Sequence, residues 1–266
     1  MRKLHQKVTY GFQKPISIEI VEPVKYSDED ILEFTESLWQ VHSNVFKNID
    51  RVTFVNYVLF PEAKLTRIHV FRKRDGEIIG FFSIHHFDKE FEGKRVTVLR
   101  GEIGVLPEYR RQHYVIKEII KAGLLNRLRY GFREVWVLGC FISPAMYSLM
   151  ANMAFRVYPN YRYIIPDRIR QLMLQLADKF DLPESDKNTP LVRNIGWISR
   201  QAIASEVEFS ESRNEDVQFY LNQNPQYTQG YGLEIFIPLS FINMLLSTFN
   251  MALGELGISR RIYARY

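Results

Sequence analysis

Residues 96–126 constrain the fold more than any other stretch of this chain. The first part is rich in apolar, β-prone residues, which predicts a strand. Pro107 ends this strand, because proline has no N–H group to donate to a neighbouring strand. Apolar residues then recur at three- and four-residue spacing, which predicts the buried face of a helix. The residues on this face are Val115, Ile116, Ile119, Ile120 and Leu124.

A polar turn with two arginines, residues 108–113 (E-Y-R-R-Q-H), separates the predicted strand from the predicted helix. The first N–H groups of a helix have no partner inside it and lie at the positive end of the helix dipole. A turn at this place is therefore suited to bind a phosphate group. The alternative interpretation is a solvated turn without a ligand.

The segment V-L-P-E-Y-R-R-Q, residues 105–112, resembles motif A of the GNAT superfamily of N-acetyltransferases. In that family an R/Q-x-x-G-x-G/A loop after the strand cradles the pyrophosphate of coenzyme A. The resemblance implies that the motif A strand holds the pantetheine arm of the donor, and that the following turn contacts its phosphates. The donor-binding residues implied in this way are Ile103, Val105, Arg110, Arg111, Gln112, His113, Tyr114 and Val115. Two of them, His113 and Val115, replace the small residues of the family loop.

A second segment, residues 143–159 (SPAMYSLMANMAFRVYP), resembles motif B of the same family, with Leu149 and Phe155 in matching places. Family members often carry a tyrosine in this motif that protonates the leaving thiolate, and Met150 takes its place here. The nearest hydroxyl belongs to Tyr147, roughly one helical turn earlier. Tyr147 is therefore the candidate general acid, and the alternative is an aromatic side chain packed in the core.

Glu102 lies in the motif A strand, where family members commonly keep a glutamate as general base. Acyl transfer to an amine requires a neutral nucleophile, so a base or a chain of water molecules must remove a proton. The neighbours Ile103 and Val105 are apolar, and burial among such residues raises the pKa of a carboxyl group. The alternatives are a charge on a solvated strand face or an ion pair with Arg100.

The order of the predicted elements gives the fold class. Strands are predicted at 16–21, 65–72 and 78–87, and Asp75-Gly76 between the last two is a strong hairpin signal. The motif A strand, its helix, another strand and another helix follow. We therefore expect an α+β protein of the GNAT-like kind, with a mixed, mostly antiparallel central sheet flanked by helices. This order excludes a purely alternating βαβ protein.

The chain is longer than the two motifs require. We expect a GNAT-like acyltransferase domain at 1–165 and an α/β C-terminal extension at 166–266 that is packed on it. The extension includes a predicted helix at 166–180, a polar, turn-rich stretch at 214–232 and a predicted helix at 241–253. The residues 233–238 (LEIFIP) alternate well enough to form a strand, and we expect this strand to return to the same sheet.

The amino-acid composition excludes several other classes of protein. The chain is 46% hydrophobic, which suits a sizeable core and not a disordered chain. Its single cysteine, Cys140, excludes an internal disulfide and a cysteine-based metal cluster, and no histidine–glutamate motif predicts a metal. The N-terminal residues lack an apolar run, so we expect a cytoplasmic protein. The net charge of +5 suits an anionic ligand, but no nucleic-acid motif accompanies it.

The sequence therefore predicts an N-acyltransferase of the EC 2.3.1 class, which moves an acyl group from a thioester to a small primary amine by direct attack. The donor is acyl-CoA or, because of the altered turn, an acyl-carrier protein. No metal is expected. The extension is predicted to cover the acceptor site or to form a homodimer face. The predicted helix at 241–253 is too short and interrupted to span a membrane, and we expect it to pack on the domain. The alternative function is a non-catalytic GNAT-fold module that binds a ligand or a protein.

Overall fold

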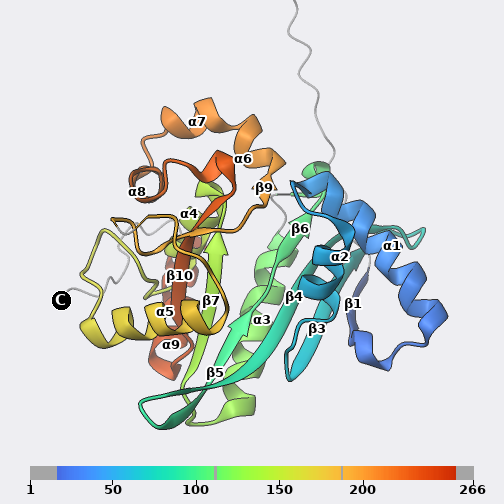
Figure 1. Cartoon of the computed structure of the whole chain (residues 1–266), viewed down its shortest axis with the longest axis horizontal. Helices are drawn as coiled ribbons and strands as arrows, with labels where there is room; N and C mark the ends of the chain where they lie inside the picture. Colours follow the sequence, from blue (N-terminus) through green and yellow to red (C-terminus); the bar gives the residue numbers. More distant parts are fainter. Residues whose placement is uncertain (1–16, 111–112, 187, 256–266) are drawn as a thin grey trace, which may run out of the picture.

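The computed structural model describes residues 17–110, 113–186 and 188–255 (Figure 1). Its main feature is one central sheet with the strand order β1-β3-β4-β5-β7-β10-β8, in which β6 pairs with β4 as a continuation of β5. Only β5 and β7 run parallel, and the other pairs are antiparallel. The strands are β1 Ser17–Val21, β3 Leu65–Arg72, β4 Ile78–Phe91, β5 Lys94–Arg100, β6 Ile103–Val105, β7 Val135–Phe141, β8 Val192–Asn194 and β10 Tyr231–Pro238. This arrangement confirms the predicted fold class.

Helices cover both faces of the sheet. α1 (Asp28–Val45) packs on the face that carries Phe81, and α3 (His113–Tyr130) packs on the face that carries Ile84. Residues 81 and 84 differ by an odd number, so their side chains leave β4 on opposite faces. Ser27 is the N-cap of α1, because its hydroxyl accepts a hydrogen bond from the N–H of Asp30.

A short helical segment follows α1 and packs on the same face of the sheet. It consists of α2 (Arg51–Phe54) and one π-helical turn (Val55–Leu59). Phe54, Val58 and Leu59 are fully buried against β3 and β4 in the cluster below α1. Of the aromatic residues of this region, Phe54 belongs to the core, whereas Phe60 is 42% exposed.

The C-terminal part adds strands and helices to the same body. β10 contains the residues 233–238 and pairs antiparallel with β7, from Leu233 opposite Phe141 to Pro238 opposite Trp136. The stretch 214–232 was expected to be polar and turn-rich, and it also contains a helix that was not predicted. Asn214 caps this helix by accepting from the N–H groups of Asp216 and Val217. The helices of this part are α5 Asp167–Lys179, α6 Arg200–Ala204, α7 Glu206–Ser210, α8 Glu215–Gln223 and α9 Phe241–Glu255.

The largest buried cluster joins this C-terminal part to the motif B helix, α4 (Pro144–Met153). The rings of Trp136 on β7 and Phe236 on β10 stack with centroids 4.5 Å apart. A small two-stranded sheet makes a second connection, since β2 (Phe46–Lys47) pairs with β9 (Ile198–Ser199). The C-terminal residues thus share one core and one sheet with the first part of the chain. No helix within the described ranges is long and apolar enough to cross a membrane.

Candidate functional site

The centre of the sheet opens where β7 leaves β5. The parallel pairing of these two strands covers only Thr97–Leu99 opposite Val135–Val137. Beyond that point the β5–β6 strand stays with β4, while β7 continues alongside β10. The edges of β6 and of the second half of β7 therefore part, and the space between them is not filled by another strand.

A kink at Gly101 shapes this opening. The sequence predicted one continuous strand, but the strand is divided into β5 and β6 at Gly101 and Glu102 without a change of register. The N–H of Glu102 donates to the Ser83 hydroxyl (3.0 Å) instead of a backbone carbonyl, and the N–H of Ser83 donates to the Glu102 carbonyl (2.9 Å). A Cβ atom at residue 101 would lie 1.9 Å from the Ser83 carbonyl oxygen, so only glycine fits. The glycine inside the strand pattern is the signal from which this kink could have been predicted.

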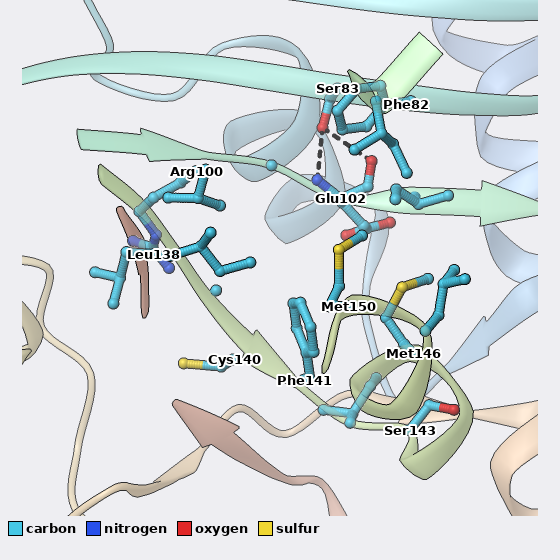
Figure 2. A pocket seen from close by; sticks show the side chains of 18 of the residues that line it. Phe82, Ser83, Arg100, Glu102, Leu138, Cys140, Phe141, Ser143, Met146 and Met150 are labelled. Carbon is cyan, nitrogen blue, oxygen red and sulfur yellow. Dashed lines mark hydrogen bonds between the residues drawn. The ribbon is translucent and has the colours of Figure 1, made fainter. Parts of the chain in front are cut away.

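A cavity of about 980 Å³ occupies the opening (Figure 2). Its walls come from the kinked strand, the end of β7, the helices α3, α4 and α9, and the segment between α5 and α7. Most of the lining is apolar, and methionines are frequent in it. These are Met146, Met150 and Met153 of α4 and Met244 and Met251 of α9. The polar and charged groups in such a surrounding are the ones that define its chemistry.

Glu102 faces this cavity from the kink, beside Met146 and Met150 (Figure 2). Its Oε1 lies 2.9 Å from Nε2 of His42 on α1, and the exposed fractions of the two side chains are 8% and 0%. Arg100, the partner suggested by the sequence, has no ion pair with Glu102. This contact does not have hydrogen-bond geometry, and neither carboxyl oxygen of Glu102 has a hydrogen-bond partner among the described residues. Glu102 is therefore a sequestered carboxyl group that lies against a histidine.

His42 is a site residue that the sequence reasoning missed. Five aromatic rings surround it, with centroids 4.7 to 6.2 Å from the imidazole, and they belong to Trp39, Phe46, Phe54, Phe81 and Trp197. The available signal was its place on the buried stripe of α1, four residues after Leu38. Nothing in the sequence connected this position with Glu102, which lies 60 residues later on another element.

Only some of the predicted donor-binding residues are found in the lining of the cavity. Ile103, Val105, Arg110 and Val115 line the cavity. Arg111 and Gln112 lie outside the described residues, and for His113 and Tyr114 only the backbone at the start of α3 is described. Arg110 is engaged inside the protein, because its Nε donates to the Val105 carbonyl and its Nη1 donates to Oε1 of Gln201, each at 2.8 Å. Burial lowers the pKa of Arg110.

Tyr147, the candidate general acid, is fully buried in the core beneath α4. Its hydroxyl donates to the Pro159 carbonyl (3.0 Å), and its ring packs against Phe219 and Tyr220. It does not belong to the cavity lining. Burial raises the pKa of Tyr147 above its usual range. This position corresponds to the alternative interpretation of a core aromatic, so we assign no proton transfer to Tyr147.

Cys140 lines the cavity near the end of β7. Burial raises the pKa of its thiol to about 12, so it is protonated at neutral pH and is a poor nucleophile. Within the described part of the chain, no group of three or more histidine, cysteine, aspartate or glutamate side chains is placed to hold a metal ion. The lining also includes the carboxyl groups of Asp181 and Glu208, which are exposed to solvent. Glu102 is the buried carboxyl group of the cavity and is therefore the candidate for proton transfer.

Comparisons with known proteins give only distant likenesses. No family model and no curated protein matches the chain. Among solved structures, the chain is similar to Tetrahymena GCN5, with 10% identity, a TM-score of 0.37, and coverage of 85% of this chain and 97% of that chain. It is also similar to the ribosomal-protein-alanine N-acetyltransferase of Brucella melitensis biovar Abortus 2308, with 15% identity, a TM-score of 0.37, and coverage of 56% and 98%.

A third similar structure is the GNAT family N-acetyltransferase YhbS of Escherichia coli in complex with CoA. Its identity is 14% and its TM-score is 0.33, and the match covers 52% of this chain and 68% of that chain. At this similarity, the names of these proteins carry no information about the activity of the present chain.

Proposed function

We propose that this chain, which has a divergent GNAT-like fold, transfers an acyl group from a thioester to a primary amine in the cavity between β6 and β7. The observation that carries the proposal is the parting of the two parallel strands at Gly101, with the Glu102 carboxylate beside the opening. The resemblance of residues 105–112 to motif A points to the same strand.

The edge of β6 supports binding of the donor arm. On the β4 side, the Glu102 carbonyl accepts from the N–H of Ser83, and the N–H of Leu106 donates to the Ile79 carbonyl. Because backbone groups alternate along a strand, those of Ile103 and Val105 point away from β4 and toward the cavity. An extended pantetheine arm, which carries two amide groups, would bind to this edge like an added strand. The Val105 carbonyl already accepts from Arg110, so this pairing relies mainly on Ile103.

The proposed reaction is a direct attack. The amine nitrogen adds to the thioester carbonyl, the C–N bond forms, and the C–S bond breaks. Glu102 takes the proton that the amine gives up, directly or through water, and this proton returns to the thiolate that leaves. His42 is a positioning residue in this scheme, because its imidazole lies against the Glu102 carboxyl group without lining the cavity itself.

The apolar walls favour an acyl group longer than acetyl. The cavity continues from Glu102 between α3, α4 and α9, where the lining is formed by isoleucine and methionine side chains. Methionine is flexible and adapts its shape to an apolar ligand. We propose that this part holds the acyl chain and that the donor is a medium- or long-chain acyl-CoA, with an acylated carrier protein as the alternative.

Calorimetric titration with acetyl-CoA, decanoyl-CoA and free coenzyme A tests the donor site. The expected result is micromolar binding of decanoyl-CoA and weaker binding of the other two. The variant Met150→Trp fills the apolar side of the cavity and should weaken decanoyl-CoA binding more than acetyl-CoA binding. The absence of heat with all three donors, and with a decanoyl-loaded carrier protein, contradicts the proposal.

One observation favours the second candidate, a non-catalytic binding module. Arg110, the only described arginine of the phosphate-binding turn, is tied to Val105 and to Gln201 of α6. A donor phosphate would have to displace these contacts. The module therefore predicts that no thioester is consumed under any condition, whereas the enzyme predicts release of a free thiol when a suitable amine is present.

A further inference from the structure

Arg100 brings a positive charge into the cavity without a carboxylate to balance it. No ion pair of Arg100 within 4.0 Å occurs among the described residues, and its Nε is buried without a hydrogen-bond partner. The guanidinium lies between two aromatic rings, 4.5 Å from the Phe180 centroid and 5.7 Å from the Tyr57 centroid. The lining of the cavity includes Arg100 and both of these aromatic residues.

The neighbouring titratable groups do not supply the missing negative charge. The charge of Glu234 interacts with that of Arg100, but Glu234 is fully buried and its Oε2 accepts from Nε of Arg193 at 2.8 Å, so Arg193 is its ion-pair partner. Burial lowers the pKa of His85 to about 3 and raises the pKa of Cys140 to about 12, so both are neutral at pH 7. Burial also raises the pKa of the Tyr57 hydroxyl. Glu102, the nearest carboxylate along the strand, lies against His42.

An isolated charge in an apolar surrounding destabilises a fold unless a partner compensates it. Aromatic stacking compensates only a small part of this cost. An arginine kept in such a place is suited to bind an anionic group of a ligand, and its planar fork matches a carboxylate through two parallel hydrogen bonds. The Phe180 ring lies 4.5 Å from the guanidinium, and the Tyr57 hydroxyl forms a side-chain hydrogen bond with it, while the buried Nε has no partner and is available for this contact.

Arg100 and Glu102 lie close together on one face of their strand, so a ligand that binds Arg100 through an anionic group also meets the Glu102 carboxyl group. Arg100 lies opposite His85 on β4, and the Glu102 carbonyl accepts a hydrogen bond from the N–H of Ser83 on the same strand. Residues 83 and 85 share one face of β4, so the two charged side chains leave their strand on the same face, roughly 7 Å apart at the backbone. Both charges act on the hydroxyl of Tyr57, the Arg100 guanidinium lowering its pKa and the Glu102 carboxylate raising it.

We propose that the amine acceptor of this site is an amino acid, whose carboxylate binds Arg100 while its amino group faces Glu102. This inference rests on the proposed function, because it names the acceptor class of the same cavity. The separated positive and negative groups of the site complement the negative and positive ends of a zwitterion. The apolar lining favours an amino acid with an apolar side chain.

The test compares three ligands that differ only at the carboxylate: leucine, leucinamide and isoamylamine. Each is titrated calorimetrically, with and without saturating coenzyme A. Leucine is expected to bind at least tenfold more tightly than the other two. The variant Arg100→Met should abolish this difference, while Arg95→Met, an exposed position on the same strand, should preserve it. Phenylalanine and its amide serve as a second pair for a larger apolar side chain.

A purely structural role for Arg100 makes the opposite prediction. If the guanidinium served only to hold Tyr57 and Phe180, Arg100→Met would lower the Tm and leave the ratio of leucine to leucinamide affinity unchanged. The binding role predicts an unchanged or higher Tm, because the variant removes an uncompensated charge, together with loss of the ratio. Equal affinity for leucine and leucinamide in the natural chain, or no binding of any pair in either condition, overturns the inference.

The outcomes also separate this inference from the proposed function. If decanoyl-CoA binds and its thioester is consumed equally with leucine and leucinamide, the acyl transfer stands and the role of Arg100 is refuted. If leucine binds with the expected preference but no donor binds and no thiol appears, the amino-acid site stands and the acyl transfer is refuted.

Discussion

Replacing Gly101 with alanine tests whether the kink that opens the cavity is built into the strand. The added Cβ would lie 1.9 Å from the Ser83 carbonyl oxygen, and contacts under 3.0 Å essentially never occur for real Cβ atoms. The contacted oxygen belongs to the backbone and cannot rotate away as a flexible side chain would. The two strands β4 and β5 would therefore have to separate by about 1 Å in a region packed as densely as a crystal.

The magnitude follows from the contacts that this separation breaks. Two hydrogen bonds join Ser83 and Glu102 here, at 2.9 and 3.0 Å. Each contributes about 0.5–1.5 kcal/mol, and overpacking adds about 1–3 kcal/mol. We expect Gly101→Ala to lower the free energy of unfolding by about 2–6 kcal/mol.

Urea unfolding followed by circular dichroism measures this change, and Gly123→Ala is the matched control. Gly123 lies inside α3, and a Cβ there would meet only Leu239, at 4.0 Å. Alanine is preferred over glycine in a helix by about 1 kcal/mol, so the control should stabilise the chain. Substitutions at unremarkable surface positions usually change the free energy of unfolding by less than about 0.5 kcal/mol. A change of this size or smaller for Gly101→Ala would therefore refute the steric reasoning.

Three further predictions concern the charged groups. Glu102→Gln should lower kcat by about 10²–10⁴ with unchanged donor Kd, as loss of a general base does, and an unchanged kcat in stopped thiol-release assays would remove Glu102 from the mechanism. Burial lowers the pKa of His85 to about 3 and of His86 to about 4, so both stay neutral in the folded chain while the unfolded chain takes up protons below about pH 6.5. Stability should therefore fall as pH falls from 6.5 toward 4, by up to about 1.4 kcal/mol per pH unit for each histidine, and a flat urea-melt profile would contradict these pKa values. Arg193→Met should cost about 3–5 kcal/mol because it leaves Glu234 buried and unpaired, whereas the double variant with Glu234→Leu should recover most of this loss in the same melts.

The central strand–turn–helix was predictable because its periodicity is strong. The apolar spacing from Val115 onward and the stop at Pro107 depend on local sequence alone, and both elements lie where they were expected. The hairpin at Asp75-Gly76 was equally clear, because Gly76 takes the left-handed backbone (φ 89°) that such turns favour.

Other parts depended on contacts between distant residues, which periodicity does not report. The helix α8 was missed because its N-cap, Asn214, lies in a polar stretch that looks like a series of turns. The pairing of Glu102 with His42 joins a strand to a helix far away in the sequence. The side chain of Arg110 turned back to Val105 and Gln201, which no spacing rule could anticipate.

The C-terminal part has a direct consequence for the site. β10 occupies the free edge of β7, while Gln201 holds Arg110 and α9 forms one apolar wall of the cavity. The residues beyond α4 therefore shape the cavity in which we propose that the acyl chain binds. If the proposed reaction takes place, this arrangement predicts that the donor carries an acyl group longer than acetyl.

The most direct test of acyl transfer is a thiol-release assay with mass spectrometry of the products. The purified chain is mixed with decanoyl-CoA and an equimolar set of amino acids and simple amines, and Glu102→Gln is run beside it. We predict free coenzyme A together with an N-decanoyl product in equal amounts, and neither with the variant. An intact thioester after incubation with every amine, or thiol release that is equal in the variant, would contradict the proposed function.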